Sequence, residues 1–166
     1  MFYNFSMAKI TIGNRVGKNG RLGVGCSASI FDARGEKVLL ARRTDNGKWT
    51  APGGYMESGE NFSEACMREV WEETGLKVTV KRLIGIFTSP NHLVEYADGN
   101  KWQLVVLHFE AEFVSGELKP SEETTEFGFF SIPEINDLDM NNLDRKRVLA
   151  GFAKSSGAII NDDFTL

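Results

Sequence analysis

The sequence is poor in cysteine and has no long hydrophobic run. Cys26 and Cys66 are the only cysteines in 166 residues, and their spacing matches neither a metal site nor a CxxC motif. We therefore expect two reduced thiols in the core of a cytoplasmic protein, not a disulfide scaffold. No apolar stretch approaches the ~20 residues of a transmembrane helix. The first ten residues, MFYNFSMAKI, lack the basic and apolar regions of a signal peptide.

Positive charge is also in short supply. The chain has 19 Lys and Arg against 23 Asp and Glu, a formal net charge of -4. A net negative charge argues against a dominant surface for nucleic acids or anionic membranes, so neither partner is expected; a local basic patch is the alternative. The composition, 42% hydrophobic and 25% charged, is ordinary for a globular protein. Its length predicts one domain over residues 1–166.

Segments with strand character alternate irregularly with segments of helical character. Residues 50–60 and 89–102 are expected to be loops, because they are rich in glycine or in polar turn residues. In 103–113, odd-numbered apolar residues should face the core, and His108, Glu110 and Glu112 the solvent. With no regular βαβ rhythm, the pattern predicts an α+β fold with a mixed sheet covered by helices. The expected strands are 24–31, 36–43, 77–87, 103–113 and 126–132, and the expected C-terminal helices are 132–139 and 141–155.

A helix is predicted from about residue 62 to residue 74. Asn61 and Glu64 have the spacing of a capping box, and Gly75 stands where a helix often ends. Val70 and Trp71 are expected to face the core.

An acidic stripe lies beside that apolar arc, because positions 69, 72 and 73 share about a third of the helix circumference. Glutamates this close repel one another by a few tenths of a kcal/mol per pair. Arg68 supplies one cation for the three carboxylates. A hard divalent cation would offset the remaining repulsion; a solvated acidic surface is the alternative.

The stretch from Gly54 to Leu76 resembles the Nudix box, whose pattern is G-x5-E-x7-R-E-U-x-E-E-x-G-U with U aliphatic. The resemblance covers roughly residues 22 to 136 and includes the preceding RRTDNGKWTAPGG. It implies the Nudix fold, an α/β/α sandwich around a mixed sheet. It also implies hydrolysis, dependent on Mg²⁺ or Mn²⁺, of a nucleoside diphosphate linked to another group. The defined positions are filled by Gly54, Glu60, Arg68, Glu69, Val70, Glu72, Glu73, Gly75 and Leu76.

The same resemblance implies roles for individual residues. It makes Glu60 and Arg68 the pair that orients the catalytic helix. The general base stays open: it is either Glu69 or a glutamate of the later loop, with Glu122, Glu123 and Glu126 as candidates. The implied metal ligands are the carboxylates of Glu69, Glu72 and Glu73 and the backbone carbonyl of Gly53.

Contacts with the substrate are less well defined. Arg42 or Arg43 could bind a phosphate and Trp102 could stack on a base, with surface and core roles as the alternatives. Pro90 stands fourteen residues after Leu76, close to a proline found in family members that cleave ADP-ribose. Tyr96 loosely matches a tyrosine of members that prefer diadenosine polyphosphates.

A small nucleotide substrate is therefore expected, with ADP-ribose or another nucleotide sugar favoured. Nucleoside triphosphate pyrophosphohydrolysis is the alternative reaction. A non-catalytic nucleotide-sensing Nudix domain is the alternative of another class, and the intact box argues against it. A homodimer is left open.

Overall fold

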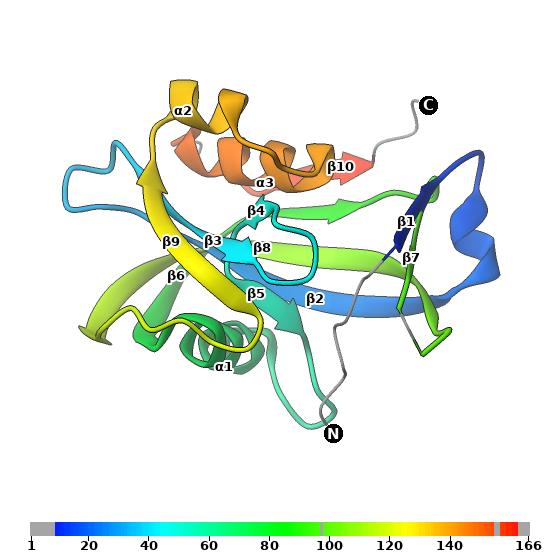
Figure 1. Cartoon of the computed structure of the whole chain (residues 1–166), viewed down its shortest axis with the longest axis horizontal. Coiled ribbons are helices and arrows are strands. Elements are labelled where there is room, and N and C mark those ends of the chain that lie inside the picture. Colours follow the sequence, from blue (N-terminus) through cyan, green and yellow to red (C-terminus); the bar gives the residue numbers. More distant parts are fainter. Residues whose placement is uncertain (1–8, 97, 155–156, 163–166) are drawn as a thin grey trace.

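The computed structural model describes residues 9–96, 98–154 and 157–162 (Figure 1). In this part of the chain the main sheet has seven strands, of which β8 is the longest. β8 pairs in parallel with β2 and antiparallel with β6, so the sheet is mixed, as predicted. The path through the sheet is β1 (Lys9–Ile12), β7 (His92–Glu95), β8 (Lys101–Gly116), β2 (Arg21–Ile30) and β5 (Gly53–Tyr55), with β6 (Leu76–Thr88) also on β8 and β10 (Ile159–Asp162) on β6.

A smaller sheet and the helices complete the fold. The smaller sheet has the order β4 (Trp49–Thr50), β3 (Val38–Arg43) and β9 (Thr124–Phe130). Figure 1 shows α1 (Phe62–Thr74) below the sheets and both α2 (Ile132–Asp137) and α3 (Asn142–Phe152) above them. A short 3-10 helix, Val16–Asn19, follows β1. This arrangement confirms the predicted sandwich of helices around a mixed sheet.

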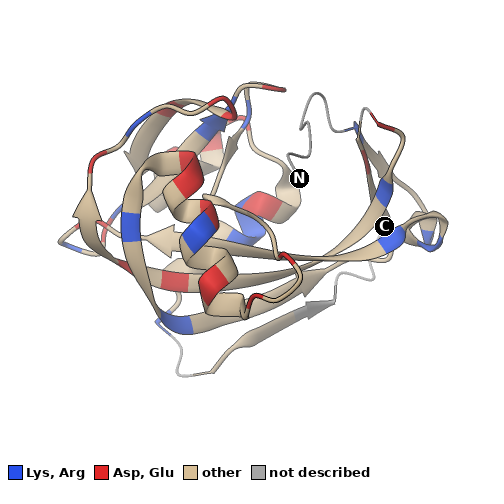
Figure 2. Ribbon diagram, turned by 90° about the horizontal axis from the view of Figure 1, so that it is seen from below, with Lys and Arg blue, Asp and Glu red and all other residues tan. Residues whose placement is uncertain are grey.

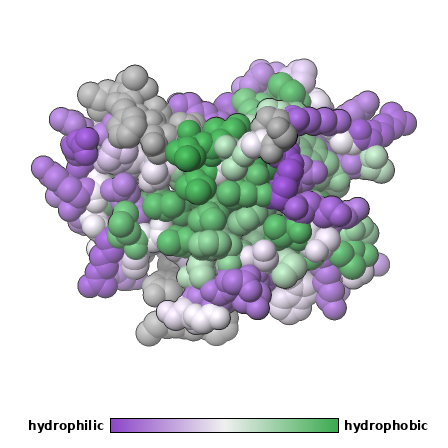
Figure 3. Space-filling model, turned by 180° about the vertical axis from the view of Figure 1, so that it is seen from behind, coloured by the Kyte–Doolittle hydropathy of each residue, from purple (hydrophilic) through white to green (hydrophobic). Residues whose placement is uncertain are grey.

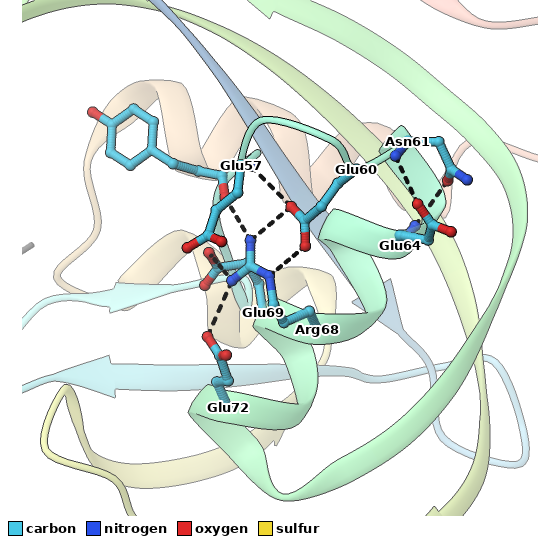
Figure 4. Close-up of polar contacts among 8 residues, drawn as sticks. Glu57, Glu60, Asn61, Glu64, Arg68, Glu69 and Glu72 are labelled. Carbon is cyan, nitrogen blue, oxygen red and sulfur yellow. Dashed lines mark hydrogen bonds and ion pairs between the residues drawn. The ribbon is translucent and has the colours of Figure 1, made fainter. Parts of the chain in front are cut away.

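The predicted box helix has the expected boundaries. The Asn61 side chain accepts a hydrogen bond from the Glu64 N–H at 3.0 Å, and the Glu64 carboxylate accepts one from the Asn61 N–H at 2.8 Å (Figure 4). Gly75 ends the helix with a φ of 78°, a left-handed conformation that favours glycine. Local capping signals therefore define both ends of α1.

One prediction about the facing of α1 is wrong. Val70 is fully buried, as expected, but the Trp71 side chain is 54% exposed. The buried positions of α1 are Ala65, Cys66, Val70, Glu73 and Thr74. Residue 71 lies about 100° away from residue 70 and therefore points off this face. The face of α1 that packs on the core therefore includes Glu73 and excludes Trp71.

His108 is the second correction to the pattern. It was expected on a solvent-facing side of β8, but it is completely buried, because α3 packs over that face of the sheet. Its Nδ1 lies 2.8 Å from the Ser27 hydroxyl and its Nε2 lies 2.9 Å from the Ser29 hydroxyl. Burial, with a smaller contribution from Arg147, lowers the pKa of His108 to about 3.

This neutral imidazole predicts a specific dependence of stability on pH. Below pH 6.5 the unfolded chain binds a proton at His108 that the folded protein excludes down to about pH 3. The free energy of unfolding should therefore fall by about 1.4 kcal/mol per pH unit below that point because of this residue. In urea unfolding, wild type should lose roughly 2 kcal/mol more than His108→Gln between pH 7 and pH 5. Equal losses would mean that the folded protein accepts the proton.

Several strands formed where the sequence indicated loops. The glycine-rich segment 50–60 contains β5, and the polar segment 89–102 contains β7. β1 and β10 were not predicted; β1 pairs with β7 and β10 with β6. These short strands take their structure from a partner that is distant in sequence, so local pattern cannot reveal them.

The two thiols are in the core. Cys26 and Cys66 are both buried and free, as expected, and burial raises the pKa of Cys26 to about 11 and that of Cys66 to about 12. No helix in the described residues is long and apolar enough to cross a membrane. Seen from behind, the molecule carries hydrophobic side chains gathered near its centre (Figure 3). A homodimer stays a prediction.

Candidate active site

Arg68 is the centre of a charged cluster on α1. Its Nε donates to Glu60 at 2.6 Å, and its Nη2 donates to Glu60 at 3.0 Å and to the Tyr55 carbonyl at 2.9 Å. Its Nη1 donates to Glu69 at 2.8 Å and to Glu72 at 3.1 Å (Figure 4). From below, α1 shows acidic positions on either side of a basic one (Figure 2). Arg68 thus joins the loop before the helix to two of the box carboxylates.

Gly53 and Gly54, at the start of the box, allow the backbone of β5 to lie against the carboxylates. A Cβ on Gly54 would come within 2.4 Å of a Glu69 oxygen, and one on Gly53 within 2.3 Å of the Cys26 carbonyl oxygen. Gly53 also has a φ of 153°, which side chains rarely adopt. Its N–H donates to the Glu73 carboxylate at 2.9 Å. The glycines therefore leave the space in which Glu69 and Glu73 are held.

Carboxyl groups are concentrated at this point, where burial and their mutual repulsion raise their pKa values. Burial raises the pKa of Glu73 to about 8, against the Gly53 hydrogen bond, and Glu69 and Glu123 raise it further. Burial also raises the pKa of Glu69 to about 7, against its pairing with Arg68. The pKa of Glu123 is raised by burial and by the nearby Glu72, while Arg43 opposes the rise. Four carboxylates from α1 and the later loop therefore act on one another.

This donor set fits a divalent cation. Carboxylate oxygens are the ligands that Mg²⁺ and Mn²⁺ prefer, and the mutual repulsion is what a cation would relieve. As the described side chains stand, no three acidic, cysteine or histidine residues converge on one point, and Glu72 is turned toward Arg68. The Glu72 side chain is 48% exposed, so it has room to rotate toward Glu69 and Glu73. Side chains of the site, Glu72 among them, would therefore have to rearrange before three carboxylates could meet at one ion.

The structure separates the two candidate arginines. Arg43 forms a bidentate pair with Asp45, at 2.8 and 2.7 Å, and lines the cavity beside Gly53 and Gly54. Burial opposes its charge, but the pair with Asp45 outweighs this and keeps the pKa of Arg43 raised. Arg42 points elsewhere, donating to the Gly47 carbonyl at 2.9 Å and to Glu126 at 3.2 Å. Of the two, Arg43 is the one that lines the cavity.

The same comparison separates the loop glutamates. Glu126 is held by Arg42 in an exposed ion pair. Glu123 is half-buried, and its charge acts on both Glu69 and Glu73. Glu123 thus belongs to the carboxylate group, and Glu126 lies outside it.

A cavity of about 440 Å³ opens beside Gly53 and Gly54. One part of its wall is aromatic, with Tyr55, Tyr96 and Phe87. The hydroxyls of Tyr55 and Tyr96 lie 2.7 Å apart. Its polar lining includes Arg43, Asn46, Lys48, Asn141, Asp144 and Arg147. The cavity therefore reaches from Gly53 and Gly54 to α3.

Sequence reasoning missed part of this wall. Trp102, a candidate for stacking with a core role as the alternative, does not line the cavity; its ring lies beside that of Tyr55 with centroids 6.0 Å apart. Asp144 and Arg147 were not singled out, because they belong to an ordinary charged helix with no motif. Only the packing of α3 against the sheet brings them to the cavity.

Comparison with known proteins identifies the family. The model of the NUDIX domain matches residues 21–152. An ADP-ribose pyrophosphatase of Methanocaldococcus jannaschii is 31% identical over 71% of this chain and 66% of its own length. An NAD-capped RNA hydrolase NudC of Pseudomonas aeruginosa is 31% identical over 80% of this chain and 45% of its own length. The chain thus spans less than two thirds of either relative.

Solved structures give the same fold. The MutT protein of Methanosarcina mazei superposes with a TM-score of 0.65 at 26% identity, covering 80% of this chain and 94% of that protein. The names of these relatives refer to hydrolases, and they differ in the substrate that they mention.

Proposed function

The chain belongs to the Nudix hydrolase family, and from this premise we propose that it cleaves the pyrophosphate linkage of a nucleoside diphosphate joined to a second group, with ADP-ribose preferred. The observation that carries the proposal is the cavity beside Gly53 and Gly54. The box carboxylates Glu69 and Glu73 lie directly against these glycines. A diphosphate at the glycines would place its two substituents along the cavity.

Glu69, Glu72 and Glu73 would hold Mg²⁺ or Mn²⁺, which when bound supplies neutralisation of the diphosphate charge. The protein's own groups position the reaction. Arg68 fixes Glu69 relative to Glu60, and Arg43 offers a guanidinium already oriented by Asp45. Glu123, whose pKa is raised by burial, would accept a proton from the attacking water.

Three observations favour ADP-ribose over a nucleoside triphosphate. Pro90 stands near the position that the family resemblance associates with ADP-ribose. The Methanocaldococcus relative is named for that activity. The cavity also offers both an aromatic and a polar wall, which suits a ligand with a base and a second sugar.

The test is product analysis on purified protein. ADP-ribose, a nucleotide sugar and deoxynucleoside triphosphates are each incubated with Mg²⁺, and in parallel with a chelator. We expect AMP and ribose 5-phosphate in equal amounts from ADP-ribose, and none when the chelator is present. Rapid release of pyrophosphate from a triphosphate, with ADP-ribose untouched, would reassign the substrate. Nucleotide binding without hydrolysis of any substrate would indicate a sensing domain.

A further inference from the structure

One wall of the cavity beside the box is formed by a single face of the main sheet. Ile10 on β1 pairs with Val94 on β7, so the two side chains lie next to each other. Leu104 and Val106 are two residues apart on β8 and therefore point to the same side. We call this surface the sheet wall; its members, all lining the cavity, are Ile10, Val94, Leu104 and Val106.

The Tyr55 ring adjoins the sheet wall on the side of the box. It contacts the rings of Tyr96 and Trp102, with centroids 6.1 and 6.0 Å apart. A Cβ on Gly23 would come within 3.0 Å of the Tyr55 ring, so glycine at this position of β2 leaves room for it. The Tyr55 hydroxyl lies 2.7 Å from that of Tyr96. The Tyr55 ring is therefore held in place by the protein itself.

The polar side chains in this part of the cavity bond to the protein itself. They are Thr88, Ser89 and His92. The Thr88 hydroxyl donates to the Leu104 carbonyl at 2.9 Å. The buried Ser89 hydroxyl accepts from the Asn91 N–H at 3.2 Å and lies 2.9 Å from the His92 Nδ1. The charged side chains of the cavity come from β3, the loop after it and α3. The surface next to Tyr55 is thus aliphatic and aromatic.

A nucleobase is the part of a nucleotide that fits such a surface. Every base has a π face, and stacking on an aromatic ring strengthens binding by about ten- to a hundredfold whatever the base. Telling one base from another requires hydrogen bonds to the base edge, and a hydrophobic pocket discriminates poorly between molecules of similar shape. A wall of this kind therefore binds purines without selecting one of them.

We propose that the nucleobase of the substrate stacks on Tyr55 against the sheet wall, and that the site accepts one purine about as well as another. The second group of the substrate then extends along the charged part of the cavity, and selectivity depends on that group. ADP-ribose is preferred for its second ribose and not for its adenine. This inference rests on the proposed function, since it assigns the two ends of the substrate to the walls of the same cavity.

A series of substrates tests the selectivity on the wild-type protein. ADP-ribose is compared with its guanosine and inosine analogues, which differ only in the purine, and with ADP-glucose, which differs in the second sugar. The kcat/KM values of the three purine substrates should agree within about fivefold. ADP-glucose should be about tenfold or more poorer than ADP-ribose. A larger spread among the purines than between the two sugars overturns the inference, because it would require a group that reads the base edge.

Calorimetry with Mg²⁺ present isolates the contact with Tyr55. The probes are AMP, GMP and IMP, with ribose 5-phosphate as the probe that lacks a base. Wild type should bind each nucleotide about ten- to a hundredfold more tightly than ribose 5-phosphate. Tyr55→Leu should reduce this ratio to about two- or threefold and leave the affinity for ribose 5-phosphate nearly unchanged. General damage to the fold would weaken the binding of all four probes together.

Phe113→Leu is the matched control, because Phe113 is a 52% exposed aromatic residue on β8 that does not line this cavity. It should keep the wild-type ratio between the nucleotides and ribose 5-phosphate.

The binding ratios also separate this inference from the proposed function. A ratio that is lost in Tyr55→Leu supports the base site even if ADP-ribose is not hydrolysed. Equal binding of AMP and ribose 5-phosphate by wild type overturns it even if ADP-ribose is hydrolysed, and this result needs no variant. A Tyr55→Leu protein that keeps the ratio, or that loses affinity for all four probes in the same proportion, overturns the role of Tyr55.

Discussion

Glu73→Gln is expected to lower kcat/KM by about a thousandfold while leaving the metal-free protein at least as stable as wild type. Glutamine has the shape of glutamate, and its carbonyl can still accept the bond that Gly53 donates at 2.9 Å. What it loses is the charge that a divalent cation requires. Because the carboxylate is buried beside Glu69 and Glu123, removing that charge also relieves a desolvation and repulsion cost.

Two measurements check this prediction. Steady-state hydrolysis gives the loss of activity, and thermal unfolding with and without Mg²⁺ gives the metal contribution to stability. The melting temperature of wild type should rise with Mg²⁺, and that of Glu73→Gln should rise much less. Glu117→Gln, at an exposed carboxylate outside the site, should behave as wild type. Near-normal turnover in Glu73→Gln at ordinary Mg²⁺ would remove Glu73 from the ligand set.

The box helix was predictable because its signals are local. The capping box at Asn61 and the left-handed Gly75 involve only residues within a few positions of each end. The side of the helix that packs is different: it depends on where Gly53 and Gly54 bring β5 against Glu69 and Glu73. Trp71 was placed in the core from periodicity alone, and that prediction failed because a carboxylate takes part of the buried face.

The candidate site was likewise predictable only where its residues are close together in the sequence. Fixed spacing in the box identified the carboxylates and Arg68, since one helix and its preceding loop carry them all. The far wall of the cavity depends on α3 packing over β8, a contact between segments distant in sequence. No local pattern distinguishes Arg147 from other cations of α3, and the burial of His108 follows from the same contact. The environments of Arg147 and His108 therefore depend on contacts between distant segments, which the sequence alone does not predict.

Glu123→Gln is expected to lower kcat by about a hundred- to ten-thousandfold, the range for loss of a general base. Added Mg²⁺ or Mn²⁺ should not restore the rate, because a base does not determine metal affinity. Glu126→Gln should retain nearly full activity, since Glu126 is tied to Arg42 at 3.2 Å and is half exposed. Glu123, just before β9, therefore serves as the test position, and Glu126, on β9, serves as its control.

Glu72→Gln completes the comparison, because a lost ligand weakens metal binding and high Mg²⁺ should recover part of its rate. Rates measured across a range of metal concentrations separate the two behaviours. An unrescued loss in Glu69→Gln, with Glu123→Gln active, would move the base onto α1. A loss in Glu123→Gln that metal does rescue would make Glu123 a ligand. The burial of Glu123 and its coupling to Glu69 and Glu73 favour the loop carboxylate as the base, because the Glu69 carboxylate is already engaged by Arg68 at 2.8 Å.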